Sequence, residues 1–217
     1  MRVVIVGASG GCGAQLVTQA KERGHEVTAV VRSTNKWKAP AGVKVIVGAL
    51  TSPAILREAL RGQDVVLSAL GLRLPGIAPW AKPEVPDFLT KSTPALIEAM
   101  KAENIKRLIA ISAGGVGDSN EKVPGVFRIF IKTTALRHAY AELEVMERLL
   151  LQSGLDVCIC RPTGLTDGPR TGQAKVCSTF QGRATISRAD VAAWMLDELE
   201  KPSFAQKTPM ISVTGIV

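Results

Sequence analysis

The stretch that decides the fold is Arg2-Val3-Val4-Ile5-Val6-Gly7-Ala8-Ser9-Gly10-Gly11-Cys12-Gly13. A run typical of a strand leads directly into a G-x-x-G-x-x-G pattern, and a helix is predicted to follow over 12–23. Glycines at this spacing let the backbone approach a pyrophosphate, and the free N–H groups of the helix N-terminus favour an anion. This context predicts a dinucleotide-binding loop made of Gly7, Ala8, Ser9, Gly10, Gly11, Cys12 and Gly13.

Strand-like and helix-like segments alternate along the rest of the 217 residues. Strands are predicted over 26–32, 43–47, 65–70, 107–112, 156–160 and 209–213, and helices over 53–60, 93–103, 135–152 and 188–199. Ser187 is the expected N-cap of the last helix, with Asp190 three residues on as in a capping box. The alternation requires a parallel sheet covered by helices on both faces. We therefore predict an α/β fold, a Rossmann-type doubly wound parallel sheet with a small C-terminal substrate lobe, over 1–217 as one domain.

The end of the second strand selects between NAD and NADP. An acidic residue at this position would hydrogen-bond the ribose 2′-hydroxyl of NAD, whereas an arginine accommodates the 2′-phosphate of NADP. The residue is Arg32, and Ser33 and Lys36 follow it without an intervening carboxylate. We therefore expect NADP(H) as the cofactor. Ligands of such sheets bind beyond the carboxyl ends of the strands, where the same crevice should collect Ala49, Leu50, Ala69, Leu70, Gly71 and Ser112.

Composition and charge exclude several other classes of protein. The formal net charge is +8, but lysines and arginines are scattered, so we expect no nucleic-acid partner. Apolar runs fall far short of the roughly 18 residues of a membrane span, and the N-terminal residues resemble no signal peptide, so a cytoplasmic protein without a membrane partner is expected. The four cysteines show no metal-ligand spacing, which favours reduced thiols and no metal site.

An ordered set of short motifs runs through nearly the whole chain. Besides the glycine loop, it includes Val31-Arg32, Val47-Gly48, Gly62-Gln63-Asp64, Leu70-Gly71, Ile111-Ser112-Ala113, Lys122-Val123-Pro124, Ser153-Gly154-Leu155, Arg161-Pro162, Asp167-Gly168-Pro169 and Ile186-Ser187-Arg188-Ala189-Asp190. With these motifs the chain resembles the atypical short-chain dehydrogenase/reductases of the NmrA-like, NAD(P)H-binding group, and within it the biliverdin-IXβ reductase and flavin reductase-like proteins. The resemblance implies hydride transfer from NADPH to a small flavin, tetrapyrrole or quinone-like substrate, with Pro162 beside the cofactor.

The chain departs from its relatives at residues tied to catalysis. It lacks the Y-x-x-x-K pair of ordinary short-chain dehydrogenases, because Tyr140 is followed by Glu144, and a carboxylate there would raise the tyrosine pKa. A family aspartate that contacts the adenine is replaced by Ala49, and a substrate-side histidine of biliverdin-IXβ reductase would fall at Gly164. The remaining candidates for catalysis are Ser112 and His138, because histidine is a residue type suited to proton donation.

Two functions remain open from the sequence alone. The first is an NADPH-dependent reductase of a planar conjugated acceptor, and the second is an NADP(H)-sensing regulator that turns nothing over. Segments 72–88, 113–132 and 163–185 are the expected substrate loops, with Trp80, Phe127 and Phe130 as candidates for stacking on an acceptor. Glu147 and Arg161 are expected to form a scaffold ion pair. We expect a monomer or a weak homodimer.

Overall fold

The computed structural model describes residues 1–34, 37–181, 183–201 and 203–215. Within these residues the central sheet has eight strands in the order β3-β2-β1-β4-β5-β6-β10-β8. Its strands are β1 (Arg2–Val6), β2 (Glu26–Val31), β3 (Lys44–Val47), β4 (Val65–Ser68), β5 (Arg107–Ile111), β6 (Asp156–Pro162), β8 (Lys175–Cys177) and β10 (Met210–Ser212). All neighbours in this sheet pair in parallel except β10 and β8, which run antiparallel.

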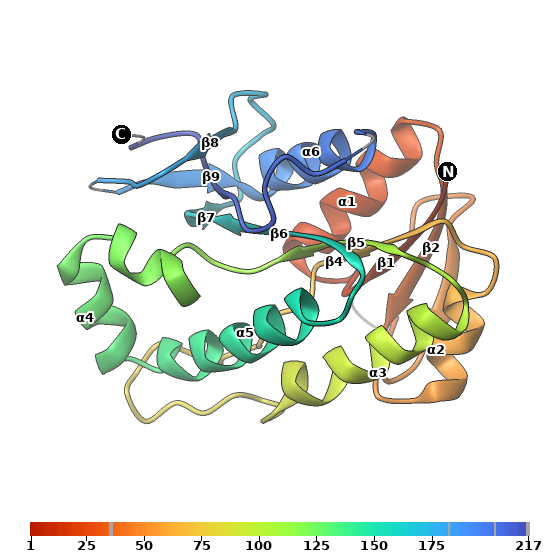
Figure 1. Ribbon diagram of the computed structural model, residues 1–217, viewed down its shortest axis with the longest axis horizontal. Coiled ribbons are helices and arrows are strands. Elements are labelled where there is room, and N and C mark those ends of the chain that lie inside the picture. Colours follow the sequence, from red (N-terminus) through yellow and green to blue (C-terminus); the bar gives the residue numbers. More distant parts are fainter. Residues whose placement is uncertain (35–36, 182, 202, 216–217) are drawn as a thin grey trace.

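Helices cover both faces of the sheet, as Figure 1 shows. The helices are α1 (Gly11–Glu22), α2 (Pro53–Leu60), α3 (Phe88–Ala102), α4 (Gly125–Thr133), α5 (Leu136–Leu151) and α6 (Arg188–Leu199). Because alternate residues of a strand point to opposite faces, Val3 and Ile5 of β1 pack with α1 and α6, whereas Val4 and Val6 pack with α2, α3 and α5. The doubly wound α/β fold predicted from the sequence is confirmed.

Two glycines allow α1 to begin directly after β1. Gly7 has φ +77°, and a Cβ atom added to it would lie 2.7 Å from the carbonyl oxygen of Ala69. A Cβ atom on Gly13 would lie 2.1 Å from the carbonyl oxygen of Gly7. Any side chain at either position would therefore force the loop apart, which explains the glycine spacing in the sequence.

The structure corrects the prediction in three segments. Helix α3 begins at Phe88 rather than Thr93, so it includes Pro94 in its interior. The predicted substrate loop over 113–132 contains a 3₁₀ helix, Gly117–Lys122, and most of α4. The predicted loop over 163–185 contains β7 (Gly164–Thr166) and β8, and β7 pairs in parallel with β9 (Thr185–Ser187) to form part of the C-terminal lobe.

The predicted N-cap of α6, Ser187, is confirmed, and Asp190 bonds to the Ser187 hydroxyl. The Ser187 hydroxyl accepts a hydrogen bond from the Asp190 backbone N–H at 2.9 Å and donates one to the Asp190 carboxylate at 2.8 Å. That carboxylate also accepts bonds from the backbone N–H groups of Thr171 and Gly172. Burial opposes ionisation, but these bonds together hold the pKa of Asp190 below its usual range. One aspartate thus starts α6 and fixes the loop that precedes β8.

We expect Ser187→Ala to lower the free energy of unfolding by about 1 to 2 kcal/mol, because α6 loses its cap. Urea denaturation at pH 7 measures the change, with alanine at the exposed Ser203 as the control. Asp190→Asn should also destabilise at pH 7. Since the folded-state pKa of Asp190 is depressed, this second loss should shrink as the pH falls through that value. A loss for Asp190→Asn that is constant with pH would contradict the assignment.

Candidate functional site

A pocket of about 800 Å³ opens at the carboxyl ends of the parallel strands. Residues that follow β1, β2, β3, β4, β5 and β6 all contribute to its lining. The chain leaves β1 and β4 toward opposite faces of the sheet, because α1 packs on one face and α3 and α5 on the other. Such a change of direction between neighbouring strands leaves a crevice, which is where open α/β sheets bind ligands.

Most of the expected cofactor residues come together in this lining. They are Gly7, Ser9, Gly10, Gly11, Cys12, Arg32, Leu50, Ala69, Leu70, Gly71, Ser112 and Pro162. Ala8 and Gly13 are buried beneath the loop, and the lining does not include Ser33 or Ala49, which are exposed. Lys36 lies outside the described residues. One half of the pocket therefore consists largely of glycines and backbone.

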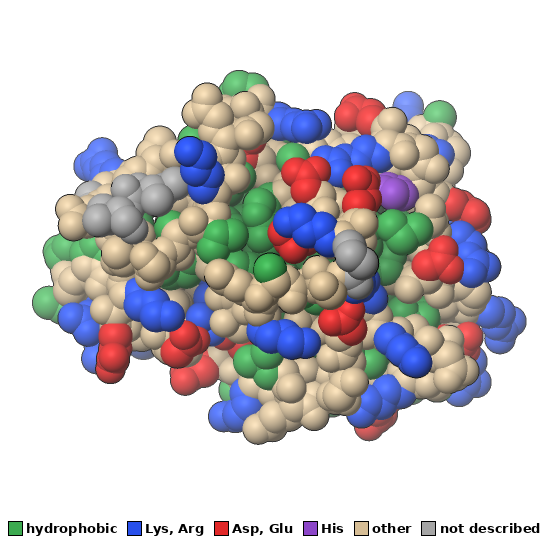
Figure 2. All heavy atoms as spheres, turned by 45° about the horizontal axis from the view of Figure 1, so that its top comes forward, with side chains coloured by type: hydrophobic (Ala, Val, Ile, Leu, Met, Phe, Trp, Pro, Cys, Tyr) green, Lys and Arg blue, Asp and Glu red, His purple; other side chains and the backbone are tan. Residues whose placement is uncertain are grey.

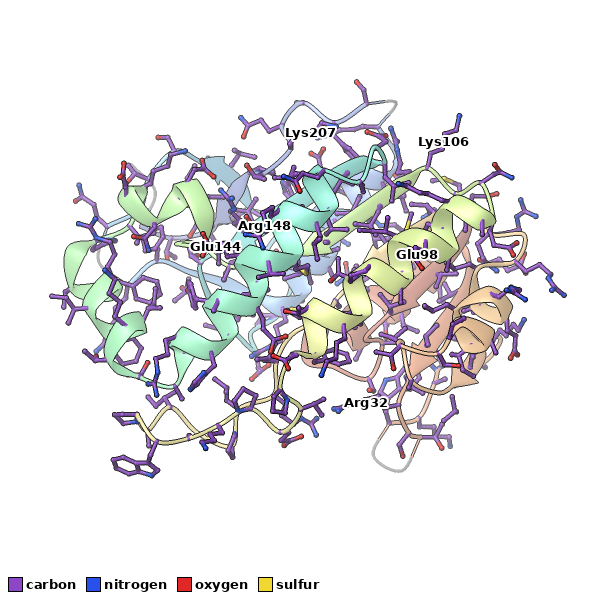
Figure 3. The ribbon with its side chains drawn as sticks, turned by 60° about the horizontal axis from the view of Figure 1, so that its bottom comes forward. Arg32, Glu98, Lys106, Glu144, Arg148 and Lys207 are labelled. Carbon is purple, nitrogen blue, oxygen red and sulfur yellow. The ribbon has the colours of Figure 1, made fainter. Side chains whose placement is uncertain are left out.

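Arg32 stands at the edge of this glycine-rich half, just beyond the end of β2 (Figure 3). Its guanidinium carbon lies 5.9 Å from the centroid of the Phe88 ring, the first residue of α3. A cation–π contact uses the face of the guanidinium. The N–H donors on its edge remain suited to a forked contact with a phosphate, which is the geometry that arginine provides and lysine does not.

The other half of the pocket is mostly apolar, although Arg73 and Glu84 of the proline-rich segment also line it. Leu72, Leu74 and Val85 come from the proline-rich segment before α3. Further apolar residues of this half come from α4, α5 and the C-terminal lobe: Phe127, Leu136, Ala139, Leu143, Leu165 and Phe180. The rings of Phe127 and Phe180 meet edge to face, with centroids 6.1 Å apart. Of the three aromatic candidates for stacking, only Phe127 lines the pocket, whereas Trp80 is 82% exposed and Phe130 39% exposed.

The hydroxyl of Ser112 is the one polar side-chain atom of the lining that the described residues leave buried without a hydrogen-bond partner. Ser112 follows β5 and is 6% exposed. Leaving a buried hydroxyl unpaired costs about 1 to 3 kcal/mol. A bound ligand with a carbonyl or amide group at this point would remove that cost, so the hydroxyl fits a ligand-contacting role.

Tyr140 also faces the pocket, but it is already engaged. Its hydroxyl donates a hydrogen bond to the Gly114 carbonyl at 3.0 Å. Burial raises the tyrosine pKa to about 12, so the predicted direction is confirmed, while the cause is burial rather than Glu144, whose side chain is exposed. His138 does not belong to the lining, although its helix neighbours Ala139 and Tyr140 do.

Several charged and cysteine side chains lie outside the pocket lining and support the surrounding fold. Arg161 forms the predicted scaffold ion pair, donating to both carboxylate oxygens of Glu147 at 3.0 and 2.5 Å, and it also donates to Asp118. Cys158 and Cys160 are both buried in the sheet face beneath α6, where burial raises the pKa of the Cys158 thiol to about 12. These groups support the fold and do not line the pocket.

Arg188, at the start of α6, is a lining residue that the sequence patterns do not reveal. A Cβ atom added to Gly11 would lie 2.6 Å from its Cδ, so the side chain lies directly over the glycine loop. Its motif, Ile186 to Asp190, is recognisable in the sequence, but a helix start gives no indication of which distant loop the first side chain reaches.

On the face drawn in Figure 2, basic and acidic side chains are interspersed rather than gathered by sign. Among the described residues, no three histidine, cysteine, aspartate or glutamate side chains come together in a group that could hold a metal ion. No helix in the described part of the chain is both long and apolar enough to span a membrane.

The fold, the glycine loop and the pocket at the strand ends define the class of Rossmann-type nucleotide-binding proteins. A family model described as NAD(P)H-binding matches residues 7–202. The chain therefore belongs to the NAD(P)H-binding family. This confirms the resemblance to the atypical short-chain dehydrogenase/reductases and makes a nicotinamide dinucleotide the cofactor of the family.

Individual relatives agree with this assignment. The Bacillus subtilis protein YwnB is 30% identical over 93% of this chain and 93% of its own length. The probable pinoresinol-lariciresinol reductase 3 of Arabidopsis thaliana is 27% identical over 99% of this chain and 68% of its own. The structure of ChuY from Escherichia coli O157:H7, described as an anaerobilin reductase, has a TM-score of 0.81 and 24% identity, covering 100% and 99% of the two chains. At that identity ChuY shows the likeness of fold.

Proposed function

We propose that the protein is an NADPH-dependent reductase that transfers hydride to a planar conjugated molecule, such as a flavin, a tetrapyrrole or a quinone. The observation that carries this proposal is a single pocket whose glycine-rich half continues into an apolar half with the rings of Phe127 and Phe180. A planar, largely apolar acceptor suits the second half. The names of two relatives, both reductases, support the reaction class.

The polar groups in the pocket favour an acceptor that needs little help from an acid. Tyr140 donates its proton to a backbone carbonyl and has a raised pKa, and no lysine stands four residues after it. NADPH, when bound, supplies the hydride. A conjugated acceptor spreads the negative charge that it receives, so the chain has mainly to orient the two rings and exclude water. The Ser112 hydroxyl, buried without a partner among the described residues, supports a role in orienting a carbonyl or carboxamide by a hydrogen bond.

Purified protein mixed with NADPH and FMN, a quinone or a biliverdin should consume NADPH, seen as loss of absorbance at 340 nm. Ser112→Ala should lower kcat/KM by up to about 10-fold, since one neutral hydrogen bond is lost. Alanine at the exposed Ser203 should leave the rate unchanged. No turnover above background with any of the three acceptor classes would contradict the reductase.

The exposed apolar residues beside the pocket favour a second candidate function, an NADP(H)-sensing regulator. Trp80 is 82% exposed, Val126 77% and Ile129 63%, and these are the residues that a partner protein would cover if they form one contiguous apolar patch. A regulator would bind NADPH, consume none with any acceptor, and co-purify with a partner. Turnover by a protein without a partner would exclude this candidate.

A further inference from the structure

Two sources of positive charge lie together at the glycine loop, the guanidinium of Arg188 and the N-terminus of α1. Arg188 is the first residue of α6, and its Cδ and Nε atoms would lie 2.6 and 2.8 Å from a Cβ atom placed on Gly11. Gly11 is in turn the first residue of α1. The guanidinium therefore stands at the N-terminus of α1, whose unpaired N–H groups carry the positive end of the helix dipole.

The described residues supply α1 with little negative charge of its own. Its N-cap is Gly10, which offers no side-chain acceptor, and its first turn contains no acidic residue. Burial raises the pKa of the neighbouring Cys12 thiol to about 11, and Arg188 acts on that thiol in the opposite direction. The charge of Arg188 thus reaches the first turn of α1, where its attraction for an anion adds to that of the helix.

The carboxylate that neutralises Arg188 can be exchanged at small cost. Arg188 Nη1 lies 2.6 Å from Asp167 Oδ1, but the Asp167 side chain is 89% exposed and that of Arg188 is 29% exposed. Ion pairs open to water contribute little, at most about 1 kcal/mol. A phosphate oxygen held against the loop N–H groups can therefore replace Asp167 as the partner of the guanidinium.

The position of Arg188 is fixed from the C-terminal side of the fold. α6 packs along α1, and the Asp190 carboxylate holds both Ser187 and the loop at Thr171 and Gly172. The residue that lies over the first βα loop thus comes from the last quarter of the sequence.

We propose that Arg188 binds the pyrophosphate of the dinucleotide, exchanging Asp167 for a phosphate oxygen. The proposal rests on the proposed NADPH function and adds to it a second cationic contact. Arg32 and Arg188 then have separate tasks, since Arg32 selects the 2′-phosphate and Arg188 holds the pyrophosphate that NAD and NADP share.

Calorimetric titration with ligands that carry one of the two groups separates these tasks. Arg188→Ala should weaken NADPH and ADP-ribose by the same factor, about 5- to 50-fold, and leave adenosine 2′-monophosphate, which has no pyrophosphate, unchanged. Arg188→Lys should recover part of the loss, because a point charge remains. Alanine at the exposed Arg170, which removes the same charge from the neighbouring loop, should change none of the three affinities.

Asp167→Asn distinguishes a direct contact from a scaffold. If Arg188 touches the phosphate, removing its carboxylate partner should leave NADPH binding unchanged or tighten it. Loss of affinity in Asp167→Asn equal to that in Arg188→Ala would overturn the proposal, as would Arg188→Ala with wild-type affinity for NADPH or with an equal loss for adenosine 2′-monophosphate. Wild-type protein that binds NADPH poorly or not at all would instead contradict the proposed function.

Discussion

Glu147→Ala is expected to lower the free energy of unfolding by about 3 to 5 kcal/mol. The side chains of Glu147 and Arg161 are 4% and 3% exposed, and the glutamate receives two hydrogen bonds from the guanidinium. Without Glu147, Asp118 is the one carboxylate among the described residues that still pairs with the buried Arg161 charge, and the Asp118 side chain is 64% exposed. Urea denaturation of wild type and variant measures the loss.

Two further variants test the reason for this loss. Replacing the pair together, as Glu147→Leu with Arg161→Met, should restore much of the stability, because no buried charge is left without a partner. Lys91→Ala, which breaks the exposed pair with Asp87, should change stability by no more than about 0.5 kcal/mol. A loss below about 1 kcal/mol for Glu147→Ala would show that the pair is not a significant support of the fold.

Arg32→Ala should weaken NADPH binding by roughly 10- to 150-fold, which corresponds to the loss of a charge-assisted contact worth about 1.5 to 3 kcal/mol. NADH binding should scarcely change, because NADH lacks the 2′-phosphate. The position of Arg32 in the pocket lining and the Phe88 ring behind it motivate this expectation. Calorimetric titration of both cofactors decides it.

Phe88→Leu and Arg61→Ala complete that experiment. Removing the ring should cost NADPH affinity only about 2- to 5-fold, since it orients the guanidinium without touching the phosphate. Arg61 is exposed and absent from the lining, so its alanine variant should bind both cofactors as wild type does. Equal losses for NADH and NADPH in Arg32→Ala, or a wild-type preference for NADH, would contradict NADP selection.

The parts of the fold that follow from local chemistry could be predicted from the sequence. The glycine loop is readable because a Cβ atom at Gly7 or Gly13 would clash with backbone, so those positions admit only one residue type. Strands β1, β2, β4, β5 and β6 are readable as apolar runs, because they are buried on both faces. The residues after the strand ends could be predicted to line one pocket, because parallel strands direct their carboxyl ends to the same edge of the sheet.

Tertiary context decided the parts that could not be predicted. Pro94 argues against a helix interior, yet packing of Leu89, Leu96 and Met100 against the sheet keeps α3 continuous around it. Helix α4 begins at Gly125, directly after Pro124, although a Pro-Gly pair favours a loop, and the helix leaves Val126 and Ile129 exposed. The apolar half of the pocket depends on where α4, α5 and the C-terminal lobe lie, and the position of Arg188 depends on the packing of α6 along α1. No local sequence pattern encodes either arrangement.

One half of the pocket is formed mainly by backbone and the other mainly by side chains, and this difference affects how the protein can change over evolutionary time. The glycine-rich half relies on backbone geometry that tolerates almost no substitution. The apolar half relies on side chains from the proline-rich segment, α4, α5 and the C-terminal lobe, where exchanging one aliphatic or aromatic residue for another leaves the sheet intact. Under the proposed reductase function, a lineage with this architecture can acquire new acceptors by point substitution in the apolar half while the nucleotide site stays constant.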